Sequence, residues 1–363
     1  MERPTIWEEE NEAAQHMAAV LYPSDTVEVR AQKHKELEFW WREQQQPRLV
    51  ESIPDDFPRL PYREDHKEQN CLLHWGQRKL LIEEINNLIE YGHLTRDVLY
   101  IGAAPGTHLI VLQRLFPHHH FHLWDAAAFA LPPHPAWTIH QKFFTDQDAQ
   151  DWVKKPVILW SDIRCGQPYN KRRGPNPTFE NGVLRNIQQQ EHWVETIRPK
   201  IALLKLRFPF TEGTTTTLAG TKLVQAWAPP YSAECRLLVP EPEREYPKKE
   251  YSHREHEEQM YYFNRCVRRS DHPHTISLVG VDHCHDCALE IAVLQRYIDK
   301  FHPKTDSRRS RDRTVPELMN EISWFLDHMG RRKLLDYPHG FYTKVPHCRR
   351  ELLINPRRIK HAE

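Results

Sequence analysis

The sequence has little glycine, no long apolar run and no net charge. Only 12 of its 363 residues are glycine, against 28 prolines, so a glycine beside a predicted strand is unusually informative. No apolar run approaches the roughly 18 residues of a membrane span, and the acidic start of the chain lacks a secretory signal. Lys plus Arg and Asp plus Glu both number 50, which excludes a uniformly basic nucleic-acid coat but not local basic patches.

Cysteine is also sparse. The seven cysteines, an odd number spread along the chain, fit a reducing compartment better than a disulfide framework. The hydrophobic fraction is 39%, and 11 Trp and 13 Tyr argue against wholesale disorder. The 24 His make the net charge rise steeply below neutral pH. The composition therefore predicts a soluble, intracellular, globular protein with no membrane contact.

The beginning of the chain differs from the rest. Polar helices are predicted around residues 7–20 and 26–47, and the proline-rich stretch that follows them indicates an extended connector. Residues 1–55 therefore form a helical N-terminal extension, either an appendage or an arm that packs back on the core.

From about residue 70, short apolar runs alternate with helical patterns. The predicted helices cover 77–92, 107–116 and 181–197. The predicted strands cover 97–102, 121–125, 138–144, 156–163 and 200–208, with two further strand-like pieces within 225–240. This alternation predicts an α/β fold with a doubly wound, mostly parallel sheet. The uninterrupted apolar runs fit strands that are covered on both faces.

The carboxyl-terminal part is predicted to contain two more helices. Asp286 is expected to cap a helix over 287–301, and Thr314 with Glu317 has capping-box spacing for a helix over 315–329. We therefore expect a central α/β domain over 56–268 and a C-terminal extension over 269–363 that packs on the same domain.

The sharpest local signal is DVLYIGAAPGTH at residues 97–108. A strand enters a glycine turn and then a helix, where Gly102 and Gly106 allow close approach of the backbone to a ligand. The spacing is not that of the dinucleotide motif GxGxxG, which disfavours NAD. Asp125 ends the next strand, where a carboxylate can accept hydrogen bonds from ribose hydroxyls. The pattern favours an adenosine-cofactor pocket, with an ordinary strand-turn-helix and a capping Asp as the alternative.

Four polar residues stand at or near the ends of predicted elements: Lys79, Asp162, Lys205 and Glu234. Lys205 interrupts an apolar strand, so it is expected to be buried unless it faces a cleft. A partly buried lysine near a second cation has its pKa pushed down towards neutrality, which makes it a plausible general base for a hydroxyl proton. Each residue alone is more often a strand-end charge or a structural salt bridge, and only their joint arrangement suggests catalysis.

These motifs resemble a known family. YIGAAPGTH resembles the cofactor loop of FtsJ-like S-adenosylmethionine-dependent RNA methyltransferases. The colinear series HWGQRKLL, YIGAAPGTH, LWSDIR, LLKLRFPF, APPYSAECRLL and MYYFNRCVR, from about Tyr62 to about Arg268, is similar to the poxvirus cap-specific nucleoside 2′-O-methyltransferases. That family also supplies the small stimulatory subunit of poly(A) polymerase. The resemblance implies a Rossmann-like methyltransferase fold over 56–268 and S-adenosylmethionine as cofactor.

The resemblance assigns roles to individual residues. The family's catalytic Lys-Asp-Lys-Glu tetrad falls on Lys79, Asp162, Lys205 and Glu234, with Lys205 deprotonating a ribose 2′-OH, Lys79 lowering the pKa of Lys205 and the two acids orienting it. The implied cofactor contacts are Gln77, Tyr100, Gly102, Gly106, Asp125 and Asp162, with Phe143 or Phe144 against the adenine. This chain departs from the family at Ala127, where the family has an arginine that contacts the cofactor.

The resemblance also implies a cap-binding site. The methylated guanine of a cap is a cationic ring, which binds best between aromatic faces with carboxylates at its edge. The stacking pair falls on Tyr62 and Phe210, with Tyr231 nearby, although core packing is the alternative for Phe210. The implied acids are Glu212 and Glu257, and the implied contacts to the triphosphate or transcript are Arg207 and Ser232.

Two further features carry weaker signals. His272, His274, His283, Cys284, His285 and Cys287 lie close together, but no second spaced pair completes a zinc site, and we expect no metal. The basic loop over 171–177 is expected at the rim of the site, as a contact for RNA phosphates or as a solvated charge run.

The expected function is cap-dependent 2′-O-methylation of the first transcribed nucleotide of mRNA, converting cap 0 to cap 1. One alternative is an RNA-binding, stimulatory subunit of poly(A) polymerase with weak or no methyltransferase activity. The other is an FtsJ-like methyltransferase of internal RNA nucleotides. The expected partners are m7G-capped mRNA and a poly(A) polymerase catalytic subunit. The resemblance implies a viral source and a location in the host cytoplasm or the virion.

Overall fold

The computed structural model describes most of the chain from residue 49 to residue 330. The described ranges are 49–62, 76–164, 177–229, 232–270, 272–278, 281, 283–302 and 313–330. The helices predicted at 7–20 and 26–47 and most of the basic loop over 171–177 lie outside them. Within these ranges, no helix is both long enough and apolar enough to cross a bilayer.

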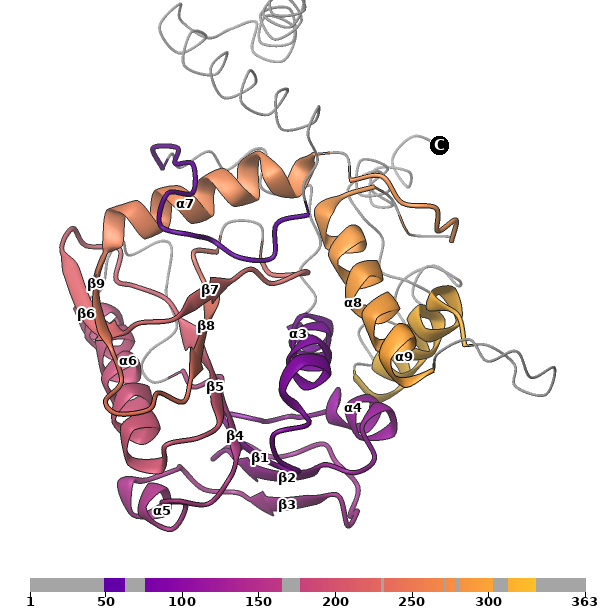
Figure 1. The fold of residues 1–363 in the computed structure, drawn as a ribbon, viewed down its shortest axis with the longest axis horizontal. Helices are drawn as coiled ribbons and strands as arrows, with labels where there is room; N and C mark the ends of the chain where they lie inside the picture. The colour runs from indigo at the N-terminus through magenta and orange to yellow at the C-terminus, as the bar shows by residue number, and fades with distance from the viewer. Residues whose placement is uncertain are drawn as a thin grey trace, which may run out of the picture.

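The centre of the protein is a seven-stranded sheet with the strand order β3-β2-β1-β4-β5-β8-β7 (Figure 1). Its strands are β1 (Asp97–Ile101), β2 (His120–Trp124), β3 (Trp137–His140), β4 (Ile158–Ser161), β5 (Ile201–Leu206), β7 (Thr221–Leu223) and β8 (Cys235–Pro240). All neighbours from β3 to β5 are parallel, whereas β8 runs antiparallel to both β5 and β7. The expected mostly parallel sheet is confirmed.

Helices cover both faces of this sheet, as a doubly wound fold requires. Figure 1 shows α3 and α4 on one face and α5 and α6 on the other. The helices are α3 (Gly76–Tyr91), α4 (Leu109–Leu115), α5 (Asp146–Gln150), α6 (Pro177–Ile197), α7 (His253–Arg265), α8 (His285–Phe301) and α9 (Val315–Gly330), with a 3-10 turn, η3 (Val267–Arg269). Because both faces are covered, every residue of β4 is buried, which explains its uninterrupted apolar sequence.

Two strand predictions need correction. β3 ends at His140, so residues 141–144 are not part of a strand, and no strand lies within 225–228. The sequence analysis also missed β6 (Thr214–Leu218) and β9 (Lys248–Ser252), which pair with each other in a separate two-stranded sheet. These strands are rich in Thr and Lys and only partly buried, so they lack the apolar pattern that revealed the central strands.

The carboxyl-terminal helices pack on the central domain. Arg78 of α3 binds Glu290 of α8 with a distance of 2.5 Å between Nη2 and Oε1, and both side chains are fully buried. The predicted capping box of α9 is confirmed, since the Thr314 N–H donates to the Glu317 carboxylate at 3.0 Å. Asp286, however, is not the N-cap of α8. Cys284 holds that position, and Asp286 is buried in the first turn against Arg268.

Candidate functional site

The glycine turn after β1 brings two strand ends into contact. Gly102 has φ +83°, and a Cβ there would lie 2.8 Å from the carbonyl carbon of Asp162. Gly106 also has a positive φ, of +72°. The turn is tied to β2 because the Gly102 N–H donates to the Trp124 carbonyl at 2.8 Å. Gly102 is therefore needed to let the ends of β1 and β4 meet closely, and Gly106 allows the left-handed backbone conformation later in the turn.

Asp125 follows β2 and is held by the same turn. One carboxylate oxygen accepts a hydrogen bond from the Ala104 N–H at 3.0 Å, and the other accepts one from the Ala127 N–H at 2.8 Å. These bonds fix the carboxylate while each oxygen keeps a lone pair for another donor. Ala127 thus contributes a backbone contact to Asp125.

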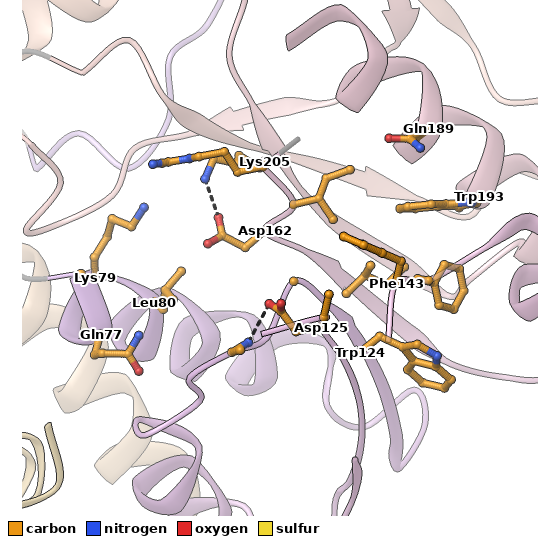
Figure 2. Close-up of a pocket in the computed structure, with 18 residues that line it drawn as sticks. Gln77, Lys79, Leu80, Trp124, Asp125, Phe143, Asp162, Gln189, Trp193 and Lys205 are labelled. Atoms are coloured by element: carbon orange, nitrogen blue, oxygen red, sulfur yellow. Dashed lines mark hydrogen bonds and ion pairs between the residues drawn. The ribbon is translucent and has the colours of Figure 1, made fainter. Parts of the chain in front are cut away.

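A cavity of about 480 Å³ opens beside these residues, at the carboxyl ends of the parallel strands. Figure 2 shows its labelled side chains converging from α3, β2, β5 and α6. Predicted residues in its wall are Gln77, Lys79, Gly102, Asp125, Phe143, Phe144, Asp162 and Lys205. Residues that the sequence analysis missed include Leu80, Trp124, Ile163, Arg164, Gln189 and Trp193. The helical pattern over 181–197 gave no sign that Gln189 and Trp193 face a cavity.

One end of the cavity is aromatic. Phe144 is buried and packs edge-on against Trp124 and Trp193, with ring centroids 5.3 and 5.0 Å away. Phe143, by contrast, is 74% exposed, although it also lines the cavity. This end can take a flat, apolar ring such as a purine base.

The opposite end of the cavity is polar. The amide oxygen of Gln77 accepts from the Thr107 hydroxyl at 2.8 Å and lies 2.8 Å from Nδ1 of His108. These contacts orient the amide and leave its NH₂ group as a donor for a ligand. Tyr100 is not among the lining residues. Its ring is 1% exposed and packs edge-on against Trp160, and burial raises its pKa well above the ordinary value.

The four predicted catalytic residues meet at the edge of this cavity. Glu234 lies between the two lysines, 2.6 Å from Nζ of Lys79 and 3.2 Å from Nζ of Lys205. Nζ of Lys205 also lies 3.1 Å from Oδ1 of Asp162. The neighbouring positions of β4, β5 and β8 in the sheet bring these residues together from segments far apart in the sequence.

Burial and charge shape the protonation of this cluster. Burial lowers the pKa of Lys205, aided by Lys79 and Arg164 and opposed by Asp162 and Glu234. Burial alone would raise the pKa of Asp162, but Lys205, Arg236 and Lys79 outweigh it and hold that pKa at about 2. The same balance holds the pKa of Glu234 well below its ordinary value. Both acids are therefore ionised while the Lys205 amine is easier to deprotonate than usual.

Arg236 is a cluster member that the sequence analysis missed. It lies two residues after Glu234 and directly opposite Lys205 in the pairing of β8 with β5. Its Nη2 lies 2.9 Å from Oδ1 of Asp162, and its Nη1 donates to the Ser161 carbonyl at 3.0 Å. Two cations directly opposite on a sheet repel each other, so Asp162 between them is needed to hold both. Residues two apart along a strand point to the same face of the sheet, so the spacing of Arg236 from Glu234 was the signal that could have revealed it.

The predicted cap-binding residues are only partly gathered. Phe210 lies nearly parallel to Phe179, with an angle of 17° and 6.4 Å between centroids. The guanidinium carbon of Arg207 lies 4.4 Å from the Phe210 ring and 4.8 Å from the Phe179 ring. Tyr62, the predicted stacking partner of Phe210, instead packs edge-on against Tyr261 at 5.4 Å.

Of the acidic residues considered for the cap, Glu180 contacts this aromatic pair directly. Oε2 of Glu180 accepts from the Phe210 N–H at 2.8 Å, and its buried Oε1 has no hydrogen-bond partner among the described residues. Burial raises the pKa of Glu257, opposed by the charge of Arg207. The side chain of Glu212 is 87% exposed and lies 3.8 Å from Arg254.

The last two predicted contacts lie near Glu234. The hydroxyl of Ser232 accepts a hydrogen bond from the Glu234 N–H at 3.1 Å, so its position is tied to that of the acid. Tyr231 lies outside the described residues.

The histidine and cysteine side chains before α8 pack against one another or are buried. The rings of His274 and His283 stack at 4.5 Å, and the side chains of Cys284 and Cys287 are buried. Within the described residues, no group of three or more His, Cys, Asp or Glu side chains is arranged to hold a metal ion.

Comparisons with known proteins point to one group. A myxoma virus (strain Lausanne) protein named cap-specific mRNA (nucleoside-2′-O-)-methyltransferase is 30% identical over 217 residues, covering 54% of this chain and 62% of that protein. A fowlpox virus (strain NVSL) protein of the same name is 30% identical over 227 residues, covering 53% of this chain and 68% of that protein. The chain thus spans less than two thirds of the length of the myxoma relative.

A solved structure gives a weaker likeness. Bluetongue virus VP4, described as a multifunctional RNA-capping production line, aligns with a TM-score of 0.34 and 11% identity, over 76% of this chain and 49% of VP4. A likeness at this level carries no argument about function. The sequence model of the family described as Poly A polymerase regulatory subunit, however, matches residues 54–273, more than half of the chain. The chain therefore belongs to the poly(A) polymerase regulatory subunit family.

Proposed function

We propose that the protein is an S-adenosylmethionine-dependent methyltransferase that acts on the ribose 2′-OH of the first transcribed nucleotide of capped mRNA. The observation that carries this proposal is Lys205, a buried amine held between Asp162 and Glu234 in the wall of the cavity. The names of the myxoma and fowlpox relatives support the same reaction. The product would be a cap 1 end made from cap 0.

The cavity fits S-adenosylmethionine. Asp125 offers both carboxylate oxygens to ribose hydroxyls, and the glycine turn keeps Cβ atoms away from the ligand. Phe144, with Phe143 and Trp193 nearby, offers an apolar surface to the adenine, and Gln77 offers amide N–H donors to the amino-acid carboxylate. The bound cofactor supplies a methyl group on a sulfonium, which is already activated for transfer.

The protein's own task is to align and deprotonate the acceptor hydroxyl. Lys205 in its neutral form takes the 2′-OH proton, and Asp162 and Glu234 orient its amine. The same two carboxylates stabilise the ammonium that results. Lys79 is paired with Glu234, and its positive charge lowers the pKa of Lys205. This keeps more of Lys205 in the neutral form that can accept the proton.

The cap is proposed to bind on the far side of Lys205 from the cofactor. A small hollow of about 40 Å³ there is lined by Lys205, Glu234, Arg207 and Phe179. We assign the face of the cationic guanine to Phe210, with Phe179 as its parallel neighbour, and the edge of the guanine to Glu180 and Glu257. The sequence-based roles of Tyr62, Glu212, Tyr231 and Ser232, and of Arg207 at the phosphates, remain part of the proposal.

The family description favours a second role. Members are described as regulatory subunits of poly(A) polymerase, so we propose a poly(A) polymerase catalytic subunit as a partner. This role does not exclude catalysis, because all four tetrad positions are filled and in contact. Viral capping relatives suggest that the protein works in the host cytoplasm or virion.

The test is transfer of labelled methyl from S-adenosylmethionine to short RNAs. We expect transfer to m7G-capped RNA, none to the same RNA already 2′-O-methylated, and a loss of roughly 10³-fold in Lys205→Ala. Cofactor binding by Lys205→Ala serves as the folding control. Transfer to uncapped RNA at the same rate would support the internal-site enzyme instead. No transfer by cofactor-bound wild-type protein would leave only the regulatory-subunit role.

A further inference from the structure

Glu83 does not line the cavity, but it contacts Arg236, a member of the charged cluster at the edge of the cavity. Its side chain is 8% exposed, and Oε2 lies 3.0 Å from Nε of Arg236. The same oxygen accepts a hydrogen bond from the amide of Gln225 at 2.5 Å. Its second oxygen is buried without a hydrogen-bond partner among the described residues. A buried carboxyl placed in this way interacts mainly with one charge, that of Arg236.

Glu83 also ends a series of alternating charges that begins at Lys79. Ion pairs connect Lys79 to Glu234, Glu234 to Lys205, Lys205 to Asp162, Asp162 to Arg236, and Arg236 to Glu83. Lys79 and Glu83 are four residues apart on α3, so they share one face of the helix. The three cations and three carboxyl groups of this series balance when Glu83 is ionised, and protonation of Glu83 adds one positive charge to that of Arg164, which lies 3.6 Å from Glu234.

We propose that Glu83 is a positioning residue for methyl transfer, which holds Arg236 against Asp162 and whose charge sets how readily Lys205 loses its proton. The proposal rests on the proposed function, in which Lys205 is the base. It predicts an action through Arg236, since Glu83 is paired with Arg236 and does not itself line the cavity.

Few other charged or titratable groups lie near Glu83 among the described residues. Arg236 and the buried Cys235 thiol face it from β8, and Lys79 faces it from its own helix. Across a small cavity of about 30 Å³ lies Glu51, which is paired with Arg296 of α8. The other lining residues of that cavity are Asn86, Gln225 and the apolar Ile82, Leu223, Val224, Ala226, Leu289 and Val293.

Glu83 changes charge near neutral pH. Burial raises its pKa to about 7, opposed by Arg236, Lys79 and the Gln225 hydrogen bond. Below pH 7 Glu83 is protonated, and the series of charges carries one more positive charge. This extra charge favours the neutral form of Lys205. Above pH 7 the carboxylate favours the ammonium form of Lys205. Loss of the proton from Glu83 therefore makes loss of the proton from Lys205 harder. As a result, the activity should rise with pH more gradually than a single ionisation allows.

The experiment is a pH profile of single-turnover methyl transfer to capped RNA from pH 5.5 to 9.5. Glu83→Gln fixes the neutral form, so we expect its rising limb to move to lower pH by roughly half to one unit and to steepen to a single ionisation. Gln225→Met removes only a hydrogen bond to the ionised form, and it should give a smaller shift in the same direction even if Glu83→Gln folds poorly. Glu51→Gln, across the same small cavity and without contact to Arg236, is the matched control and should leave the profile in place.

A second measurement needs no activity. The folded-state pKa of about 7 exceeds the unfolded value of 4.5, so the contribution of Glu83 to stability is present below pH 4.5 and is lost as pH rises through 7. The Tm of Glu83→Gln should therefore improve relative to wild type between pH 5 and pH 8. A constant Tm difference, or pH profiles that superimpose after scaling, would overturn the proposal. Absence of transfer by wild-type protein would instead refute the proposed function and leave the Tm result standing.

Discussion

The two halves of the candidate site are built in different ways. On the side proposed for the cofactor, the backbone N–H of Ala104 in the glycine turn donates to the Asp125 carboxylate, a contact that spans 21 residues. On the catalytic side, side-chain ion pairs connect distant segments, and the Lys79 to Glu234 contact spans 155 residues. The first half depends on backbone conformation, and the second depends on the identity of each charged side chain.

This difference predicts separable functions. A change in the glycine turn should affect cofactor binding with little direct effect on Lys205. A change in the ion pairs should affect proton removal while the cofactor still binds. Asp162 belongs to both halves, because it lines the cavity and also pairs with Lys205 and Arg236.

Apart from the loss of Lys205 itself, the largest effect is therefore expected from Asp162→Asn. With a pKa of about 2, the Asp162 carboxylate is ionised at all working pH values. The amide of asparagine carries no charge, so it forms no ion pair with Lys205 or Arg236. Methyl transfer should fall by roughly 10²-fold or more, while cofactor affinity falls less. Single-turnover rates and calorimetric titration of the cofactor measure the two losses. Asp97→Asn, at the opposite end of β1, is the control, and equal losses in rate and binding would contradict the separation.

A smaller effect is expected from Gly102→Ala. The new Cβ would lie 2.8 Å from the Asp162 backbone at a φ of +83°, so the turn has to shift. Cofactor affinity should fall by roughly tenfold, which corresponds to about 1.4 kcal/mol. Gly213→Ala shares the positive φ but has no atom closer than 3.7 Å, and it should bind normally. Unchanged affinity in Gly102→Ala would show that the turn does not hold the ligand.

Phe179→Leu should have a moderate effect on cap binding alone. Removing one ring of the parallel pair should weaken binding of a 7-methylguanosine cap analogue by roughly fivefold and leave cofactor binding unchanged. Fluorescence titration with the analogue and with GTP measures the change. Tyr62→Leu is the paired variant, and a larger loss there would favour the stacking pair expected from the sequence.

The smallest effect is expected outside both halves. Thr314→Ala removes the N-cap of α9, which should lower the free energy of unfolding by about 1 kcal/mol. Methyl transfer should not change, because α9 has no residue in the cavity wall. Urea denaturation checks the stability, and a loss of transfer would show that α9 contributes to the site.

The residues themselves predicted the wall of the larger cavity better than the grouping of side chains around the proposed cap site. Gly102 and Asp125 were found because a strand, a glycine turn and a strand-end acid have local signatures. Tyr62 was paired with Phe210 through the family resemblance, but the structure places Phe179 beside Phe210. Phe179 lies in the first turn of α6, two residues before the helix predicted at 181–197, and no sequence pattern assigned it a role.

The sequence by itself determined the alternation of the parallel strands with helices, the glycine turn and the largely buried position of Lys205, because these depend on local apolar patterns and backbone preferences. Only the tertiary structure decided which charges meet. Arg236 and Glu83 join the cluster because β8 inserts next to β5 and α3 packs across the sheet. Such pairings depend on distances between segments that no local pattern encodes.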